Sequence, residues 1–551
     1  MKKILIAVSV IVLLSNCSDY LKEDNKTDVL VDDLYRTVSG FENLVNASYN
    51  SLRAVHSAPF MFESGTDICV DGRNPGPVGL SEYASLSPGE VAVKTFYQTT
   101  YQAIQVCNTG VYYAALTEQT STLPSRTGEL KFIRAYYYFL LAQSFGGVSL
   151  VTDVITTAQT SFERNSEEEI YDFIVSELNE SVVLVDENPV FGRVGKRAVK
   201  HLLAKVHLTR GYTDFAASDD FTKAATLADE AINGYDLSSI TFKDLFWPGK
   251  EKNNEVLFSI QYTSTSLPNT TSGSTQSGYF GPYHGGEGLA KGYPWRSYNL
   301  IATSYFYDLF NANDVRWEGT FMNVLYERYF DFYDKADKSA VKIARYYPQA
   351  WEVADTAVWR AADVTNRAKT RILPYEIKSI DPVVNGWEQP AQYLDNGIPA
   401  VRKFDDPTAG AFGLGTSNRD VYIARLAETY LIAAEAYLMK GDKATAMDRI
   451  NKVKARAERI PGTLVLIDQN DVTIDEILDE RARELFGEYH RWFDLKRTGK
   501  LIERVMLYNK DVRDVATAFD GNNGEKKILR PIPKDALDLN SNKSFPQNPA
   551  Y

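Results

Sequence analysis

Pairs of amphipathic helices joined by short turns constrain the fold of this chain more than any other feature of its sequence. The clearest pair is expected over residues 421–440 and 443–459, with Gly441 in the turn between them. The first helix of the pair places Leu426 and Ala433 on one stripe, because residues seven apart share a helical face. Small residues on that stripe let the two helices approach closely, as stacked tetratricopeptide-like repeats require.

The same periodicity predicts further helices in the N-terminal half of the chain. A helical hairpin is expected over residues 96–147, a second over 167–184 and 196–210, and one more helix over 221–233. The repeats share the helical spacing of apolar residues but not the identities of their amino acids, so they are degenerate. The sequence therefore predicts a mostly α protein built from degenerate tetratricopeptide-like hairpins.

Two stretches depart from the helical pattern. Residues 58–88 are rich in Gly, Pro, Asp and Ser and are expected to form a long loop. Between residues 237 and 420 one strand is expected over 253–263, and 21 of the 81 residues from 279 to 359 are aromatic, against 12% in the whole chain. We therefore expect an irregular, loop-rich insertion with little β structure in this middle region, and we expect it to bind the ligand.

The N-terminus has the pattern of an export signal. Two lysines precede an apolar run over residues 4–14, which is too short to span a bilayer and suits the core of a signal peptide. The run ends in the letters LSNC, which resemble a bacterial lipobox, where Cys17 is lipidated and the chain is cut before it. An ordinary secretory signal with cleavage nearby is the alternative. We expect a signal peptide over 1–16 and a lipidated tether over 17–33.

Cys69 and Cys107 are the remaining cysteines. An exported chain permits a disulfide between them, but two cysteines in a chain of this length make no framework. Two buried thiols are the favoured state.

Charge and residue types narrow the possible functions. The formal net charge of −12 argues against nucleic acid as a partner. His201 and His207 lie six apart on a helical pattern, so they face different directions and cannot hold one metal ion together. The 72 acidic residues make carboxylate pairs inevitable, and no G-x-S-x-G, H-E-x-x-H or phosphate-loop motif singles out a reaction. We expect no enzymatic activity, no cofactor and no metal.

One charged stretch near the C-terminus carries the most specific pattern. Residues 480–500 are expected to form one amphipathic helix, whose carboxylate–basic pairs three and four apart are typical of a solvated face. Within it, residues 487–497 have the letters GEYHRWFDLKR. This run resembles the GE-x-HRWFDLKR signature of the SusD/RagB family. The letters FIRAYYYFLLAQSFGGVSLV at 132–151 and the closing PIP and QNPAY resemble other blocks of the same family.

The resemblance covers nearly the whole chain and implies a SusD-like fold. It also implies a glycan-binding lipoprotein of Bacteroidetes, anchored in the outer membrane by lipid and facing the cell exterior. Such a protein delivers nutrient to a SusC-like TonB-dependent transporter. Peptide capture by the same kind of lid, or a helical-repeat scaffold that holds other proteins, are the alternatives. The expected parts after the tether are a helical part over 34–236, the insertion over 237–420, and helical hairpins with an extended tail over 421–551.

Candidate ligand-binding residues come from the two loop-rich stretches and the first hairpin. Sugar rings need aromatic surfaces for their C–H faces and polar groups for their hydroxyls. The expected stacking surfaces are Tyr279, Tyr283 and Trp295, and the expected hydroxyl partners are Asp71, Arg73 and Arg296. Phe96 and Tyr101 stand where the family often contributes aromatics. The alternative for Tyr283 and Trp295 is that they pack the insertion against the helices.

Overall fold

The structure is a computed structural model, and it describes residues 31–551 except 73, 264–272, 283–293, 371–382, 385–386, 389–396 and 409–416. The expected signal peptide, Cys17, most of the tether, Arg73 and Tyr283 lie outside the described residues. No helix in the described ranges is both long and apolar enough to cross a membrane.

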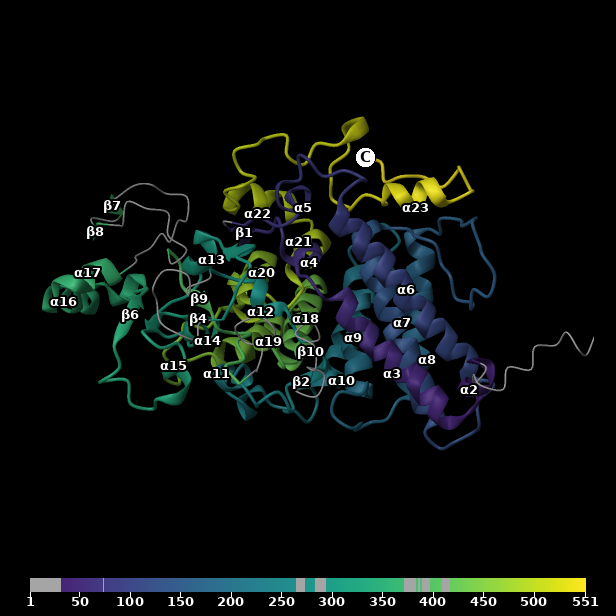
Figure 1. The fold of residues 1–551 in the computed structure, drawn as a ribbon, viewed down its shortest axis with the longest axis horizontal. Helices are drawn as coiled ribbons and strands as arrows, with labels where there is room; N and C mark the ends of the chain where they lie inside the picture. The colour runs from purple at the N-terminus through teal and green to yellow at the C-terminus, as the bar shows by residue number, and fades with distance from the viewer. Residues whose placement is uncertain are drawn as a thin grey trace, which may run out of the picture.

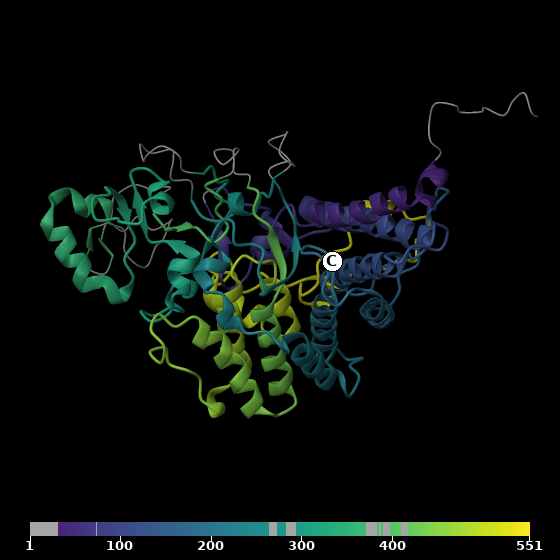
Figure 2. The ribbon, with the colours of Figure 1, turned by 90° about the horizontal axis from the view of Figure 1, so that it is seen from below.

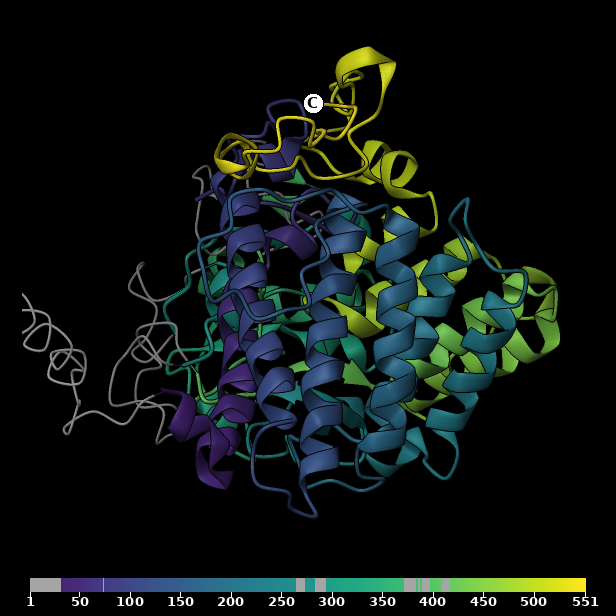
Figure 3. The ribbon, with the colours of Figure 1, turned by 90° about the vertical axis from the view of Figure 1, so that its right-hand side faces the viewer.

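The long helices form one continuous array, in which each helix packs against the next (Figures 1 and 3). Its N-terminal members are α3 (Val38–Val55), α6 (Val91–Ala114), α7 (Leu123–Phe145), α8 (Glu167–Leu184), α9 (Lys196–Arg210) and α10 (Asp220–Ile232). Helix α10 packs directly on α18 (Leu426–Met439), which contacts α19 (Lys443–Arg456) and α20 (Ile474–Leu485). The predicted helical hairpins are therefore confirmed, and the two helical halves of the sequence form a single array.

Helix α7 lies at the centre of the N-terminal half of this array. Tyr136, Tyr137 and Tyr138 are all buried, although three consecutive helical residues point in three directions. Neighbours must therefore cover α7 on nearly every side, and α3, α6, α8 and α9 do so. The helix ends at Gly146, whose φ of 71° is a left-handed conformation that glycine adopts without a Cβ penalty.

The insertion between α10 and α18 is irregular, as the sequence predicts. Among the described residues its strands lie in two-stranded antiparallel ribbons. One ribbon is formed with β1 (Cys69–Asp71) of the earlier loop, which pairs with β3 (Leu300–Ala302). The other pairs are β2 (Val256–Ile260) with β10 (Val421–Arg425), β4 (Phe321–Met322) with β9 (Ala400–Val401), β5 (Val324–Tyr326) with β6 (Ile343–Tyr346), and β7 (Val383–Val384) with β8 (Trp387–Glu388). Its helices are short: α11 (Phe242–Leu245), α12 (Gln276–Tyr279), α13 (Ser304–Asp308), α14 (Arg316–Thr320), α15 (Asp331–Asp334), α16 (Val353–Ala362) and α17 (Val364–Lys369). Figure 2 shows the insertion projecting from the helical array.

Strand β2 falls within the predicted strand over 253–263, but its partner β10 was not predicted. Residues 421–425 were expected to be helical, and they are extended instead because they pair with β2, with Val421 opposite Ile260. The pairing brings together the two ends of the insertion.

The predicted loop over 58–88 is only partly a loop. It contains α4 (Phe60–Glu63), β1 and α5 (Val78–Glu82), and residues 61–72 are buried. Polar residues such as Glu63 and Asp67 are among them, and distant segments such as β3 cover this stretch. Cys69 in β1 and Cys107 in α6 are buried free thiols, which confirms the favoured state.

The predicted helix over 480–500 is wrong in one respect, because the chain breaks it in the middle. Helix α20 ends at Leu485 and α21 (Arg491–Arg497) begins six residues later. Between them Gly487 has a φ of 74° and Tyr489 a φ of 66°. A Cβ on Gly487 would lie 2.7 Å from the Phe404 ring, so glycine is required for both conformation and space. The remaining helices are α2 (Val31–Arg36), α22 (Leu501–Tyr508) and α23 (Lys534–Leu539).

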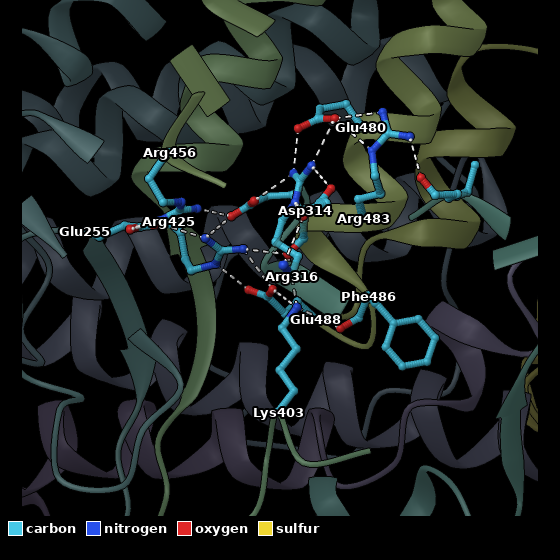
Figure 4. A network of polar contacts seen from close by, with 12 residues as sticks. Glu255, Asp314, Arg316, Lys403, Arg425, Arg456, Glu480, Arg483, Phe486 and Glu488 are labelled. Carbon is cyan, nitrogen blue, oxygen red and sulfur yellow. Dashed lines mark hydrogen bonds and ion pairs between the residues drawn. The ribbon is translucent and has the colours of Figure 1, made fainter. Parts of the chain in front are cut away.

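Buried ion pairs connect this break to the rest of the molecule (Figure 4). The Arg425 guanidinium, at the end of β10, donates to Glu484 at 3.0 Å and to Glu488 at 2.6 Å. It also donates to Glu255, just before β2, at 2.6 Å. Arg456 at the end of α19 donates to Glu255 at 2.7 Å and also binds Glu484.

Two residues of the insertion join the same network (Figure 4). Arg316 in α14 donates to Glu480 at 2.5 Å and to Glu484 at 3.2 Å. The Lys403 ammonium donates to the Glu488 carboxylate at 2.7 Å and to the carbonyl oxygen of Glu484 at 3.0 Å. All of these side chains are buried. The expectation of a solvated charged face is therefore wrong, because the charges of α20 face partners from distant segments.

The pKa values show how strongly each group depends on its partners. Burial alone would raise the pKa of Glu480, but the positive charges of Arg316 and Arg483 outweigh burial and lower it to about 2. Burial lowers the pKa of Lys403 to about 8, although the attraction of Glu488 opposes it. Each charge is thus stable only while its partners are present.

The two histidines considered as metal ligands each contact a carboxylate group. His201 lies 3.2 Å from a carboxylate oxygen of Glu428, and His207 lies 2.7 Å from Asp220. In the ranges that the structure covers, no three His, Cys, Asp or Glu side chains are placed to hold a metal ion.

We expect Arg425→Met to lower the free energy of unfolding by about 3–5 kcal/mol, because it leaves buried carboxylates without their cation. The matched control is Arg36→Met, which removes an exposed pair with Asp32 at 2.9 Å and should leave the free energy of unfolding almost unchanged, because solvent screens the pair. Urea denaturation of both variants measures the difference. Equal losses for the two variants would show that the buried network does not hold the fold.

Candidate functional site

Two stretches that lie far apart in the sequence, one after β1 and one before β3, meet beside the β1–β3 ribbon. Cys69 pairs with Ala302 and Asp71 with Leu300. Beyond the ribbon, the pairing continues as the Gly72 N–H donates to the Asn299 carbonyl oxygen at 2.7 Å. The two loop-rich stretches that the sequence singles out are therefore neighbours.

The loop after β1 is held through its polar groups. The side-chain amide of Asn74 donates to the carbonyl oxygen of Ser297 at 3.2 Å, and Asn299 donates to the carbonyl oxygen of Asn74 at 2.9 Å. The Ser297 N–H donates to the carbonyl oxygen of Gly278 in α12 at 2.7 Å. We refer to the described residues 71, 72, 74, 276–281 and 294–299 together as the junction.

Arg296 fixes the junction from inside. Its side chain is buried, and its guanidinium donates to the carbonyl oxygens of Ser277 at 2.6 Å and Phe280 at 2.9 Å. It also donates to the Val401 carbonyl oxygen at 2.8 Å and pairs with Asp405. The expected role of Arg296 as a partner for ligand hydroxyls does not fit this placement, because its donors are used within the fold.

The neighbouring Trp295 is placed in the opposite way. Its side chain is 46% exposed, whereas Arg296 next to it is 4% exposed. A large aromatic ring is thus presented to solvent on a backbone that Arg296 holds rigidly. The exposed Asn74 lies on the adjacent strand of the junction, where its backbone N–H donates to the Tyr298 carbonyl oxygen at 3.3 Å.

Tyr279 is partly buried, and its ring packs edge-on against the ring of Phe60, with the centroids 5.2 Å apart. Phe60 is also partly buried and covers the backbone at Gly76, where a Cβ would lie 2.6 Å from the ring. Phe60 was missed in the sequence, although it follows a proline just as the other presented aromatics stand beside Pro or Gly.

Asp71 lies beneath the surface of the junction. It is 6% exposed and accepts a hydrogen bond of 2.8 Å from the Ser81 hydroxyl. Burial raises the pKa of its carboxyl group to about 6, and the nearby Asp511 adds to this effect. Asp71 therefore supports the loop, and its carboxylate offers little surface to a ligand.

The two candidate aromatics on α6 belong to the helical array. Phe96 is buried and packs edge-on against Phe62 at 5.7 Å. The Tyr101 hydroxyl donates to the carbonyl oxygen of Ser149 at 2.8 Å. The expected ligand contacts at Phe96 and Tyr101 do not fit these placements, because the periodicity that makes α6 a helix also turns these rings into its packed face.

Comparisons with known proteins agree with the fold. The family model described as "SusD family" matches residues 254–551, and one described as "Starch-binding associating with outer membrane" matches residues 22–208. SusD-like protein P2 of Formosa agariphila is 24% identical over 580 aligned residues, which cover 100% of both chains. Starch-binding protein SusD of Bacteroides thetaiotaomicron is 31% identical over 132 residues, 24% of this chain and 22% of that protein.

Solved structures show the same architecture. A laminarin binding SusD-like protein aligns with a TM-score of 0.67 at 21% identity, covering 94% of this chain and 100% of that chain. Surface glycan-binding protein A from Bacteroides fluxus aligns with a TM-score of 0.63 at 18% identity, covering 93% of this chain and 99% of that chain. Since a family model matches more than half of its length, the chain belongs to the SusD/RagB family.

Proposed function

We propose that this protein is a cell-surface glycan-binding lipoprotein that captures an oligosaccharide or polysaccharide and delivers it to a SusC-like TonB-dependent transporter. The observation that carries the proposal is the exposed indole of Trp295 on a rigid junction. The names of two relatives, which mention starch and laminarin, support a glycan as ligand.

The chemistry of the junction suits a sugar. The exposed Trp295 ring offers a flat apolar surface for the C–H face of a pyranose, and the amide of Asn74 lies within the same junction. Because Arg296 and Asp405 already fix the backbone, little conformational entropy is lost when a ligand binds. Capture and delivery need no bond to break, so the proposal assigns no catalytic residue and no cofactor.

The proposed localisation rests on the sequence of the N-terminus. We propose that residues 1–16 are removed and that Cys17 carries the lipid, so that residues 17–33 tether the body to the outer membrane on its exterior side. The body then comprises 34–236, the insertion 237–420 and the part 421–551. These boundaries are supported by α10, which ends at Ile232, and by β10, which begins at Val421.

A glycan array on the chain from residue 18 onward tests the function. We expect retention of β- or α-glucans or other polysaccharides and no retention of unrelated peptides. Binding of extended peptides instead of glycans would favour the peptide-capturing lid. Binding of neither would favour a helical-repeat scaffold and contradict the proposal.

We expect Trp295→Ala to weaken binding of the glycan identified on the array by about 1–3 kcal/mol, because a stacking surface is lost. The melting temperature should change little, since the side chain is 46% exposed. Calorimetric titration and a thermal melt on the same variant measure both effects.

Two controls bracket this result. Tyr112→Ala removes another exposed aromatic, on α6, and should leave binding unchanged. Trp317→Ala removes a fully buried ring and should cost about 3–5 kcal/mol of folding stability. A large drop in melting temperature for Trp295→Ala would show that Trp295 packs the insertion and is not a stacking surface.

The proposed partner is tested by extraction of the native, lipidated protein in mild detergent. We expect co-purification with a SusC-like β-barrel, because a tethered protein with no membrane-crossing helix in its described part needs a transporter to move its ligand. Recovery of the protein alone, under conditions that keep other outer-membrane complexes intact, would contradict the partnership.

A further inference from the structure

A pocket with a volume of about 370 Å³ lies between α3, residues 190–193 and the end of β2. This volume falls within the range of about 300–1,000 Å³ that is usual for small-molecule sites. None of its lining residues belongs to the junction around Trp295. The pocket is therefore a separate candidate site.

Neutral amides form much of the polar wall of this pocket. Asn46, Asn50 and Gln261 line it, and within the described part of the chain the side-chain amides of Asn50 and Gln261 have no hydrogen-bond partner. Each amide offers a donor and an acceptor, which is the combination that a sugar hydroxyl requires. Gly192, with a φ of 91°, lies directly against the Gln261 side chain, since a Cβ there would be 2.2 Å from the amide carbon.

Two arginines line the pocket, and the first is neutralised by the protein. Arg193 donates to Glu129 at 2.8 Å and to Glu42 at 3.3 Å. Its guanidinium also lies over the Tyr49 ring, 5.4 Å from the centroid. Arg193 is therefore part of the wall and holds Tyr49 in place.

The second arginine, Arg53, has no carboxylate partner among the residues that the structure describes. Its guanidinium donates twice to the carbonyl oxygen of Gln261, at 3.1 and 2.5 Å, and lies 4.7 Å from the centre of the Tyr262 ring. No Asp or Glu is among the described residues that line the pocket. Asp420 lies on the other side of the same segment, where its carboxylate accepts hydrogen bonds from the Ser259 hydroxyl at 3.2 Å and the Tyr262 N–H at 3.1 Å. In a chain with a net charge of −12, a half-buried arginine that forms no ion pair with a described residue is a specific place for an anion.

We propose that this pocket binds a sugar carrying one acidic group, a uronate carboxylate or a sulfate ester. Arg53 receives the acidic group, and Asn50 and Gln261 hydrogen-bond the ring hydroxyls. The aromatic rings of Tyr49 and Phe191, which also line the pocket, meet the apolar face of the ring. This second site extends recognition beyond capture at Trp295 and does not depend on it.

The experiment uses saturation-transfer NMR with the mature chain and four probes at millimolar concentration: glucuronate, glucose 6-sulfate, glucose and acetate. We expect glucuronate and the sulfate ester to bind about tenfold more tightly than glucose, because a charge-assisted hydrogen bond is added. Arg53→Gln should reduce the affinity for both acidic sugars to that for glucose. Comparison of the carboxylate and the sulfate ester tells which acidic group the pocket prefers.

Three further variants make the result specific. Asn50→Ala, at an exposed helical position, should keep the fold and weaken glucuronate binding without changing the response to acetate. Arg513→Gln removes the same charge from a half-exposed side chain outside this pocket and should change nothing. Trp295→Ala should leave glucuronate binding intact, so failure of the first site and failure of this one are distinguishable.

Three outcomes would overturn the proposal. The first is equal binding of glucuronate and glucose by the unmodified chain. The second is acetate binding as strong as glucuronate binding, which would mean an anion site without a sugar. The third is no saturation transfer to either acidic sugar.

Discussion

The rest of the structure depends on the cluster of buried charges around Glu484 and Glu488. Arg425, Arg456, Arg316 and Lys403 reach these two residues from β10, α19, α14 and the segment after β9. Removing one member of a buried ion pair leaves an uncompensated charge, which is far more costly than never having buried the pair. The segments that supply these charges therefore have to assemble together, and the cluster fixes the position of the insertion on the helical array.

The parts of the fold that could be predicted are those determined locally. The observed bounds of α8 and α9 are those expected, because apolar residues three and four apart specify a helix without reference to the rest of the chain. The break after Leu485 could not be predicted from periodicity. It depends on the Phe404 ring, which occupies the space beside Gly487. The extended conformation of β10 depends in the same way on β2, its distant partner.

Burial of charged and aromatic side chains could be predicted least well. Arg296 and Trp295 are adjacent in a loop of presented aromatics, yet one is buried and the other exposed. The difference arises from Val401 and Asp405, which lie more than a hundred residues away and bind the guanidinium. Composition identified the region and the two loops that meet there. Composition could not predict which of these side chains is buried within the fold and which is exposed to solvent.

The direct packing of α10 on α18 has a consequence for how such a protein changes over time. The helical array is continuous without the insertion, whose two ends are already joined by β2 and β10. Substitutions, deletions or lengthening within the insertion therefore leave the array intact as long as Arg316 and Lys403 keep their places. Evolution can in this way alter the loops of the insertion rapidly while the scaffold changes slowly, so two descendants of one ancestor can differ in these loops and remain alike in architecture.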